Sequence, residues 1–150
     1  MKHLFFFIIV GFIISSCNSS ADKTPNDLEA LRKDSSKFTT IQWLDTAVDF
    51  GSRKMGEVVN LTFRFKNTGD KPLYLIYVRP SCGCTVADYT KTPIAPGQEG
   101  KVDAQFDTKK SHQGDVHKVI FITANNSNRA PGTLAFSGEI LADSASAEKK

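Results

Sequence analysis

Two cysteines separated by a single glycine, Cys82-Gly83-Cys84, are the residues of this chain whose types and spacing could carry chemistry. In an extended strand, residues i and i+2 point to the same side, so both sulfurs would face one way. A disulfide between them needs a kink, which Gly83 permits. Three alternatives stay open: a disulfide or a thiol pair that cycles with one, a packed pair of reduced thiols, and a pair of thiolates that bind a soft ion such as Cu(I) or Zn(II).

The metal alternative has few further ligands to draw on. A closed zinc site takes about four ligands, and His112 and His117 are the remaining good candidates in the domain. Both lie in a polar loop-to-strand region, where a solvated surface histidine is the commoner explanation. We therefore assign no metal and expect no cofactor.

Motifs for enzymatic catalysis are missing from the sequence. It contains no G-x-S-x-G, no H-E-x-x-H and no Gly-rich phosphate loop. Glu57, Asp103 and Asp107 have the character of solvent-facing or turn carboxylates. The 19 basic and 16 acidic residues give a net charge of +3, which offers no reason to invoke nucleic acid. We expect neither an enzyme nor a small-molecule substrate.

The third cysteine, Cys17, ends an N-terminal targeting segment. A short basic start is followed by the apolar run Leu4–Ile14, which is too short to span a bilayer core of about 30 Å and is typical of a secretory signal. The run ends in Ile14-Ser15-Ser16-Cys17, which resembles the lipobox of bacterial lipoproteins. The resemblance implies cleavage before Cys17 and lipidation of its sulfur and amine, with the acyl chains anchoring the protein in a membrane. Asn18, in place of a retention Asp, favours the outer over the inner membrane of the cell envelope.

The domain organisation follows from these segments. We expect a signal peptide at 1–16, a lipidated cysteine and flexible tether at 17–37, one domain at 38–142 and a polar tail at 143–150. A short helix starting at Pro25 would not be stable alone.

Strand patterns dominate the domain that must position the cysteines. The clearest is an alternation in which the apolar members are Val59, Leu61, Phe63 and Phe65. The run 73–78 is apolar on both faces and predicts a central strand. Further strands are predicted near 41–43, 48–50, 101–106, 116–123 and 134–140. About seven to eight short strands with turns between them predict a single all-β, immunoglobulin-like sandwich.

Turn residues punctuate the strands. Gly51 and Gly56 bracket a tight connection, and Asn67 and Gly69 suit a turn, because these residue types tolerate positive φ. Pro96-Gly97 fits the centre of a type II turn.

A wider set of residues resembles a known bacterial family. The set comprises Phe50-Gly51, Gly56-Glu57, Phe63, Phe65, Asn67, Gly69, Pro72-Leu73, Val78, Ser81-Cys82-Gly83-Cys84-Thr85, Ile94-Ala95-Pro96-Gly97 and Phe106-Asp107-Thr108. Together they resemble the family called domain of unknown function 1573, over residues 41–140, with the Ser81–Thr85 element as the most specific part. The resemblance implies an immunoglobulin-like sandwich related to sperm-protein-type and pilus-chaperone-type domains, often behind a lipoprotein signal, and no established activity.

The expected function is that of a non-enzymatic binding or scaffold module of the cell envelope, tethered to the membrane and bound to an unknown envelope protein. The competing hypothesis is a thiol-redox or soft-metal-handling protein that uses Cys82 and Cys84. Thr46 and Ser144 each stand in an Asp-Ser/Thr-Ala pattern that resembles a bacterial O-glycosylation sequon.

Overall fold

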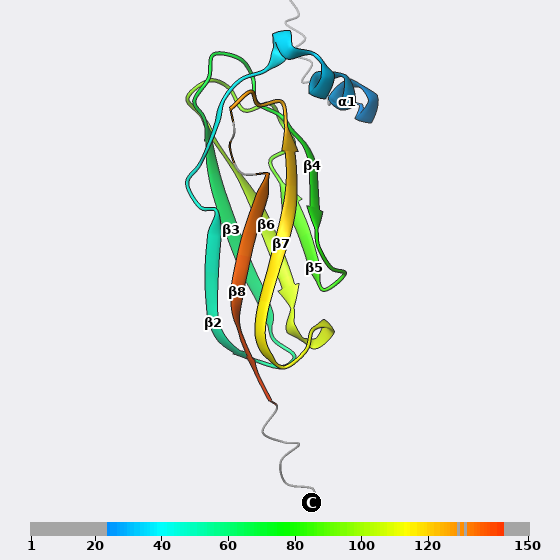
Figure 1. The fold of residues 1–150 in the computed structure, drawn as a ribbon, viewed down its shortest axis with the longest axis vertical. Coiled ribbons are helices and arrows are strands. Elements are labelled where there is room, and N and C mark those ends of the chain that lie inside the picture. Colours follow the sequence, from blue (N-terminus) through cyan, green and yellow to red (C-terminus); the bar gives the residue numbers. More distant parts are fainter. Residues whose placement is uncertain (1–23, 129, 131, 143–150) are drawn as a thin grey trace, which may run out of the picture.

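Two four-stranded β-sheets packed face to face form the domain (Figure 1). The computed structural model describes residues 24–128, 130 and 132–142. One sheet has the order β1-β3-β6-β5 and the other the order β2-β8-β7-β4. The strands are β1 (Ile41–Trp43), β2 (Ala47–Lys54), β3 (Val58–Asn67), β4 (Leu75–Pro80), β5 (Thr85–Tyr89), β6 (Glu99–Asp107), β7 (Gly114–Ala124) and β8 (Thr133–Leu141). These orders correspond to the A-B-E-D and C-F-G sheets of a constant-type immunoglobulin domain, with β2 as an additional strand beside β8, so the predicted all-β sandwich is confirmed.

The chain changes sheet near its start. β1 pairs with β3, whereas β2 pairs with β8 in parallel. A register shift between Asp49 and Ser52 interrupts the β2–β8 pairing, and Gly51 lies within it at a φ of 66°. The Asp49 carboxylate accepts a hydrogen bond from the Gly51 N–H at 2.8 Å. This bulge bends one edge of the sandwich.

The core confirms the prediction that the apolar members of the alternation at residues 59–66 face inward. The four apolar members of the alternation are all buried, and Phe63 and Phe65 have no exposed surface. Rings from both sheets meet there, since Phe106 lies 5.6 Å from Phe50 and 5.4 Å from Phe136 between ring centroids. The interior of the sandwich is therefore aromatic and shared by both sheets.

β4 is an edge strand, so the prediction of a central strand at 73–78 is wrong. It pairs with β7 only and begins at Leu75. Its inner residues are buried, but Tyr77 is 52% exposed. Pro80, which has no N–H to give to a neighbouring strand, ends β4 and suits an edge position.

Turns and close approaches fix the loops. Gly97 has a φ of 77°, and the Gln98 N–H donates to the Ala95 carbonyl at 3.0 Å, which confirms the type II turn expected at Pro96-Gly97. Asn67 and Gly69 do not have positive φ. Gly69 is needed for another reason, because a Cβ there would lie 2.1 Å from the Thr39 hydroxyl.

Buried Asn67 joins three segments of the chain through its side chain. Its amide group donates to the Lys71 and Ile94 carbonyls at 2.7 and 2.8 Å, and its carbonyl accepts from the Gly69 N–H and the Thr39 hydroxyl. The role of Asn67 is therefore a buried polar clamp rather than the turn conformation inferred from sequence.

A helix occupies part of the segment expected to be a tether. α1 (Pro25–Lys33) starts with a capping box between Thr24 and Asp27, and the 3₁₀ turn η1 (Ser35–Lys37) follows. Leu31 on this helix is only 8% exposed, and the Tyr77 hydroxyl donates to the Glu29 carboxylate at 3.0 Å. The described part of the predicted tether thus differs from a flexible chain, because burial of Leu31 supplies the tertiary contact that a short helix needs.

The remaining N-terminal and C-terminal predictions lie outside the described residues. They concern the signal peptide, Cys17, the start of the tether, the tail at 143–150 and Ser144. Within the described residues, no helix has the length and apolarity needed to cross a membrane.

Candidate functional site

Cys82 and Cys84 are joined by a disulfide in the connection from β4 to β5. Their Cα atoms lie 5.3 Å apart, inside the usual range for a disulfide. The Thr85 N–H donates to the Cys82 carbonyl at 3.4 Å, which closes the turn that supplies the expected kink. Of the three alternatives that the sequence leaves open, the structure has the disulfide.

The disulfide turn is fastened to both sheets. On one side, the Ser81 N–H donates to the Val119 carbonyl of β7 at 2.9 Å. On the other, the Asp107 N–H at the end of β6 donates to the Cys84 carbonyl, also at 2.9 Å. The segment therefore crosses from one sheet to the other and is held at each end by backbone hydrogen bonds.

The two sulfurs differ in their surroundings. Cys84 is 6% exposed and belongs to the core, whereas Cys82 is partly buried and packs against the core from outside. The hydroxyl of buried Thr85 lies 3.7 Å from the Cys82 sulfur and 3.9 Å from the Cys84 sulfur. Gly83 between them is exposed.

The histidines considered as metal ligands lie on the surface. His112 and His117 are both exposed, and the His112 Nδ1 atom lies 2.9 Å from the Gln113 carbonyl. In the part of the chain that the structure describes, no group of three or more His, Cys, Asp or Glu side chains is placed to hold a metal ion.

A second candidate site lies on the outer side of β4 and β7. Tyr77 and Phe121 are 52% and 47% exposed, although both are large and apolar. Tyr77 pairs with Thr123 and Arg79 with Phe121, so the two aromatic side chains are diagonal neighbours on one face. We call this surface the β4–β7 face; it surrounds a hollow of about 710 Å³ and consists of Tyr77, Val78, Arg79, Phe121 and Thr123.

The backbone beside the β4–β7 face is open. Opposite residues in antiparallel strands alternate between pairs that exchange hydrogen bonds and pairs that do not. Because the Ser81 N–H donates to the Val119 carbonyl, Ser81 and Val119 form a hydrogen-bonded pair, and by the alternation so do Arg79 and Phe121 two residues further on. Val78 lies between these pairs, so its N–H and carbonyl point away from β7. Among the described strands, β4 is hydrogen-bonded only to β7, although β5 of the other sheet packs near it. The unpaired edge of β4 therefore presents the Val78 backbone next to Tyr77 and Arg79.

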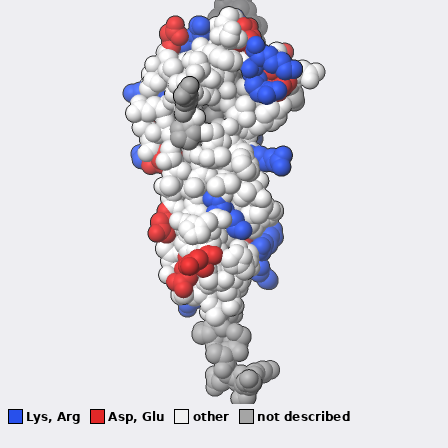
Figure 2. Space-filling model, viewed as in Figure 1, with Lys and Arg blue, Asp and Glu red and all other residues white. Residues whose placement is uncertain are grey.

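Charged side chains are unevenly spread over the face that Figure 2 shows. Lys, Arg, Asp and Glu lie at the ends, along the edges and over the lower half of this face, with few over its upper middle. Two exposed aromatic side chains, with Arg79 as the one charged residue of the lining, distinguish the β4–β7 face from an ordinary solvated surface.

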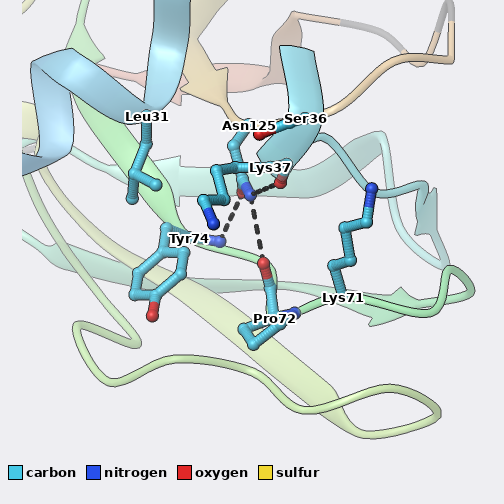
Figure 3. A pocket seen from close by; sticks show the side chains of 7 residues that line it. All are labelled: Leu31, Ser36, Lys37, Lys71, Pro72, Tyr74 and Asn125. Carbon is cyan, nitrogen blue, oxygen red and sulfur yellow. Dashed lines mark hydrogen bonds between the residues drawn. The ribbon is translucent and has the colours of Figure 1, made fainter. Parts of the chain in front are cut away.

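A smaller hollow of about 410 Å³ lies under α1 (Figure 3). Its lining residues are Leu31, Ser36, Lys37, Lys71, Pro72, Tyr74 and Asn125. The buried Asn125 amide donates to the Lys37 and Pro72 carbonyls at 2.8 and 3.0 Å, and its carbonyl accepts from the Tyr74 N–H at 2.7 Å. Asn125 therefore fastens the helical segment to the sandwich, which gives this hollow a structural explanation.

The pKa shifts of carboxyl groups arise at surface ion pairs and surface hydrogen bonds. Hydrogen bonds from Arg64 lower the pKa of Asp45, and hydrogen bonds from Arg32 and then Tyr77 lower the pKa of Glu29. The hydrogen bond from Lys101 lowers the pKa of Asp103, which also accepts from the Thr62 hydroxyl. These are surface contacts of the kind that stabilise modestly, and they differ from the buried, perturbed carboxyls of acid–base catalysis.

The other carboxylates and the sequon residue also lie at the surface. Glu57 is exposed, and the Asp107 carboxylate accepts from the Lys109 N–H at 3.0 Å, so it caps the turn η2 (Thr108–Lys110). Thr46 is exposed between β1 and β2, and its modification stays a prediction.

The fold and its connections define a single immunoglobulin-like sandwich. Residues 41–140 match the family described as "Protein of unknown function (DUF1573)", and because the match spans most of the chain, the protein belongs to this family. The comparison with curated proteins found no match.

Solved structures resemble the sandwich at low sequence identity. A protein of unknown function from Porphyromonas gingivalis W83 has a TM-score of 0.61 and 20% identity, over 71% of this chain and 49% of that one. This chain thus spans about half the length of that protein. The ASH/PapD-like domain 7 of human CEP192 has a TM-score of 0.52 and 10% identity, over 91% of this chain and 99% of that one. These likenesses bear on the fold alone.

Proposed function

We propose that this protein is a lipid-anchored component of the bacterial cell envelope whose sandwich is a non-enzymatic binding module. The observation that carries the binding role is the β4–β7 face, where Tyr77 and Phe121 stay about half exposed side by side. Large aromatic side chains contribute most of the binding energy in many protein interfaces. The surface pKa shifts and the missing catalytic motifs support a role in binding rather than in catalysis.

We propose an extended segment of another envelope protein as the occupant of the β4–β7 face. The open N–H and carbonyl of Val78 can pair with an added strand, and alternate side chains of that strand would then lie over Tyr77 and Arg79. Pro80 limits this pairing to the half of β4 nearer α1, because it offers no N–H. The favoured segment carries an apolar residue and, two positions away, an acidic residue that meets Arg79.

The membrane anchor rests on the sequence ending in Cys17. Acyl chains on Cys17 would hold the domain at the envelope, and Asn18 supports the outer membrane as its location. A module fixed in this way meets partners in the periplasm or at the membrane surface.

The experiment isolates the full, lipidated protein from detergent-solubilised envelopes and compares it with two variants. Phe121→Ser removes an aromatic side chain from the β4–β7 face, whereas Val58→Ser removes a similarly exposed apolar side chain (57%) from β3 in the opposite sheet. We expect the wild type and Val58→Ser to retain similar amounts of one partner protein. Phe121→Ser should retain at least about tenfold less, and a tenfold loss of affinity corresponds to about 1.4 kcal/mol of binding free energy.

Two results would contradict the proposal. Equal retention of the partner by both variants would place binding elsewhere. A complex that contains only further copies of this chain would mean that the protein self-associates and has no separate partner at this face.

A further inference from the structure

We propose that the disulfide turn is a thiol–disulfide exchange site in which Cys82 is the sulfur attacked and Cys84 is the sulfur released. The substrate class is a thiol, either a small thiol or the dithiol of an envelope protein. This role goes beyond the binding role of the β4–β7 face and is independent of it.

The difference in exposure decides which sulfur is attacked. Cys84 is 6% exposed and packs among core side chains, whereas Cys82 lies at the boundary between the core and solvent. Gly83 between them is exposed, and a Cβ built there would meet no atom within 4 Å. A thiolate therefore has open space beside the turn and reaches Cys82 before Cys84.

Thr85 supplies a donor for the sulfur that is released. Its buried hydroxyl lies 3.9 Å from the Cys84 sulfur and 3.7 Å from the Cys82 sulfur, a hydrogen-bond distance for sulfur acceptors. A leaving sulfur departs faster when its thiolate is stabilised, and a hydroxyl that donates to it gives that stabilisation. Thr85 is thus a positioning and stabilising residue for the Cys84 thiolate.

The exchange proceeds in two thiolate attacks. The thiolate of the substrate attacks the Cys82 sulfur, a mixed disulfide forms, the Cys82–Cys84 bond breaks, and the electron pair passes to Cys84 as a thiolate. The second thiolate of a dithiol substrate then attacks the substrate sulfur of the mixed disulfide and releases Cys82 as a thiolate. The substrate leaves as a disulfide, and two electrons have reduced Cys82 and Cys84.

The fold can survive both redox states. The Ser81–Val119 and Asp107–Cys84 hydrogen bonds involve backbone groups at the two ends of the turn, and neither depends on the S–S bond. Opening the disulfide therefore frees the turn locally while β4 and β5 stay in their sheets, as a reversible site requires.

The first test uses the full wild-type protein with reduced glutathione as the probe. Brief incubation at neutral pH, acid quenching, alkylation and peptide fragmentation locate the glutathione, and fragmentation separates this site from Cys17. We expect at least about tenfold more glutathione on Cys82 than on Cys84 in the folded protein, and no such preference in urea. Equal modification of both, a preference for Cys84, or modification only after unfolding would overturn the proposal.

The second test uses a matched pair of variants at Thr85. Thr85→Val keeps the shape of the side chain but removes the hydroxyl, whereas Thr85→Ser keeps the hydroxyl. We expect the rate of disulfide reduction by dithiothreitol to fall several-fold in Thr85→Val and to stay near the wild-type rate in Thr85→Ser. Urea unfolding verifies that both variants are folded, and a wild-type rate in folded Thr85→Val would overturn the role of Thr85.

Discussion

Asn125→Ala tests whether a buried amide fastens the helical segment to the sandwich. The side chain makes three hydrogen bonds, to the Lys37 carbonyl, the Pro72 carbonyl and the Tyr74 N–H, at 2.7 to 3.0 Å (Figure 3). A buried hydrogen bond contributes about 1 kcal/mol net, and a buried group left without a partner costs more. Water entering from the adjoining hollow can replace part of this loss. We expect Asn125→Ala to lower the free energy of unfolding by about 2–4 kcal/mol.

Two further variants make this prediction specific. Asn125→Asp keeps the acceptor for the Tyr74 N–H but loses both donated bonds at neutral pH, so it should also destabilise. Asn126→Ala is the matched control, because among the described residues the Asn126 side chain bonds to nearby Asn128 and to no distant segment. Equilibrium urea unfolding measures all three. A loss below about 1 kcal/mol for Asn125→Ala, or an equal loss for Asn126→Ala, would refute the reasoning.

Four other predictions concern Phe63, Asp45, the Cys82–Cys84 pair and Cys17. Phe63→Ala, at a fully buried position, should cost about 3–5 kcal/mol in urea unfolding; a loss below 1 kcal/mol would mean that the side chain is not in the core. The pKa of Asp45 is lowered in the folded state, so Asp45→Asn should destabilise above about pH 4 and lose this effect as the pH falls; a constant difference from wild type between pH 7 and pH 2 would contradict it. The Cys82→Ser/Cys84→Ser double variant should lose only about 1–2 kcal/mol in urea, because the disulfide closes a very short loop, and failure to fold would contradict this. Cys17→Ser should release the protein from membranes without changing its melting temperature; retention of a lipid mass by the variant would rule out the anchor.

Sequence patterns predicted the parts of the fold that depend on local periodicity. The buried phase of Phe63 and its neighbours on β3 follows from alternation alone, because successive side chains of a strand point to opposite faces. The turn at Pro96-Gly97 follows from the backbone preferences of those two residues. The need for a kink between Cys82 and Cys84 was also predictable from strand geometry.

Features that depend on distant partners were not predictable in the same way. Asn67 and Asn125 are of a residue type that is common in turns. Both are buried, however, because their side chains bond to carbonyl groups of remote segments. The edge position of β4 had one readable signal, since Pro80 within a strand argues against a central place. The exposed pair on the β4–β7 face needed the register between two strands, because Tyr77 and Phe121 are far apart in sequence.

The most direct test of the proposed binding role is photo-crosslinking in intact cells. A photoreactive amino acid replaces Phe121 on the β4–β7 face, and in a matched strain it replaces Val58 on the opposite sheet. The proposal predicts one discrete adduct from position 121, heavier than the protein and different from twice its mass, with little from position 58, and loss of the adduct when Arg79→Glu reverses the charge beside it. Equal adducts from both positions, or none from position 121, would contradict the assignment of the β4–β7 face as the binding surface.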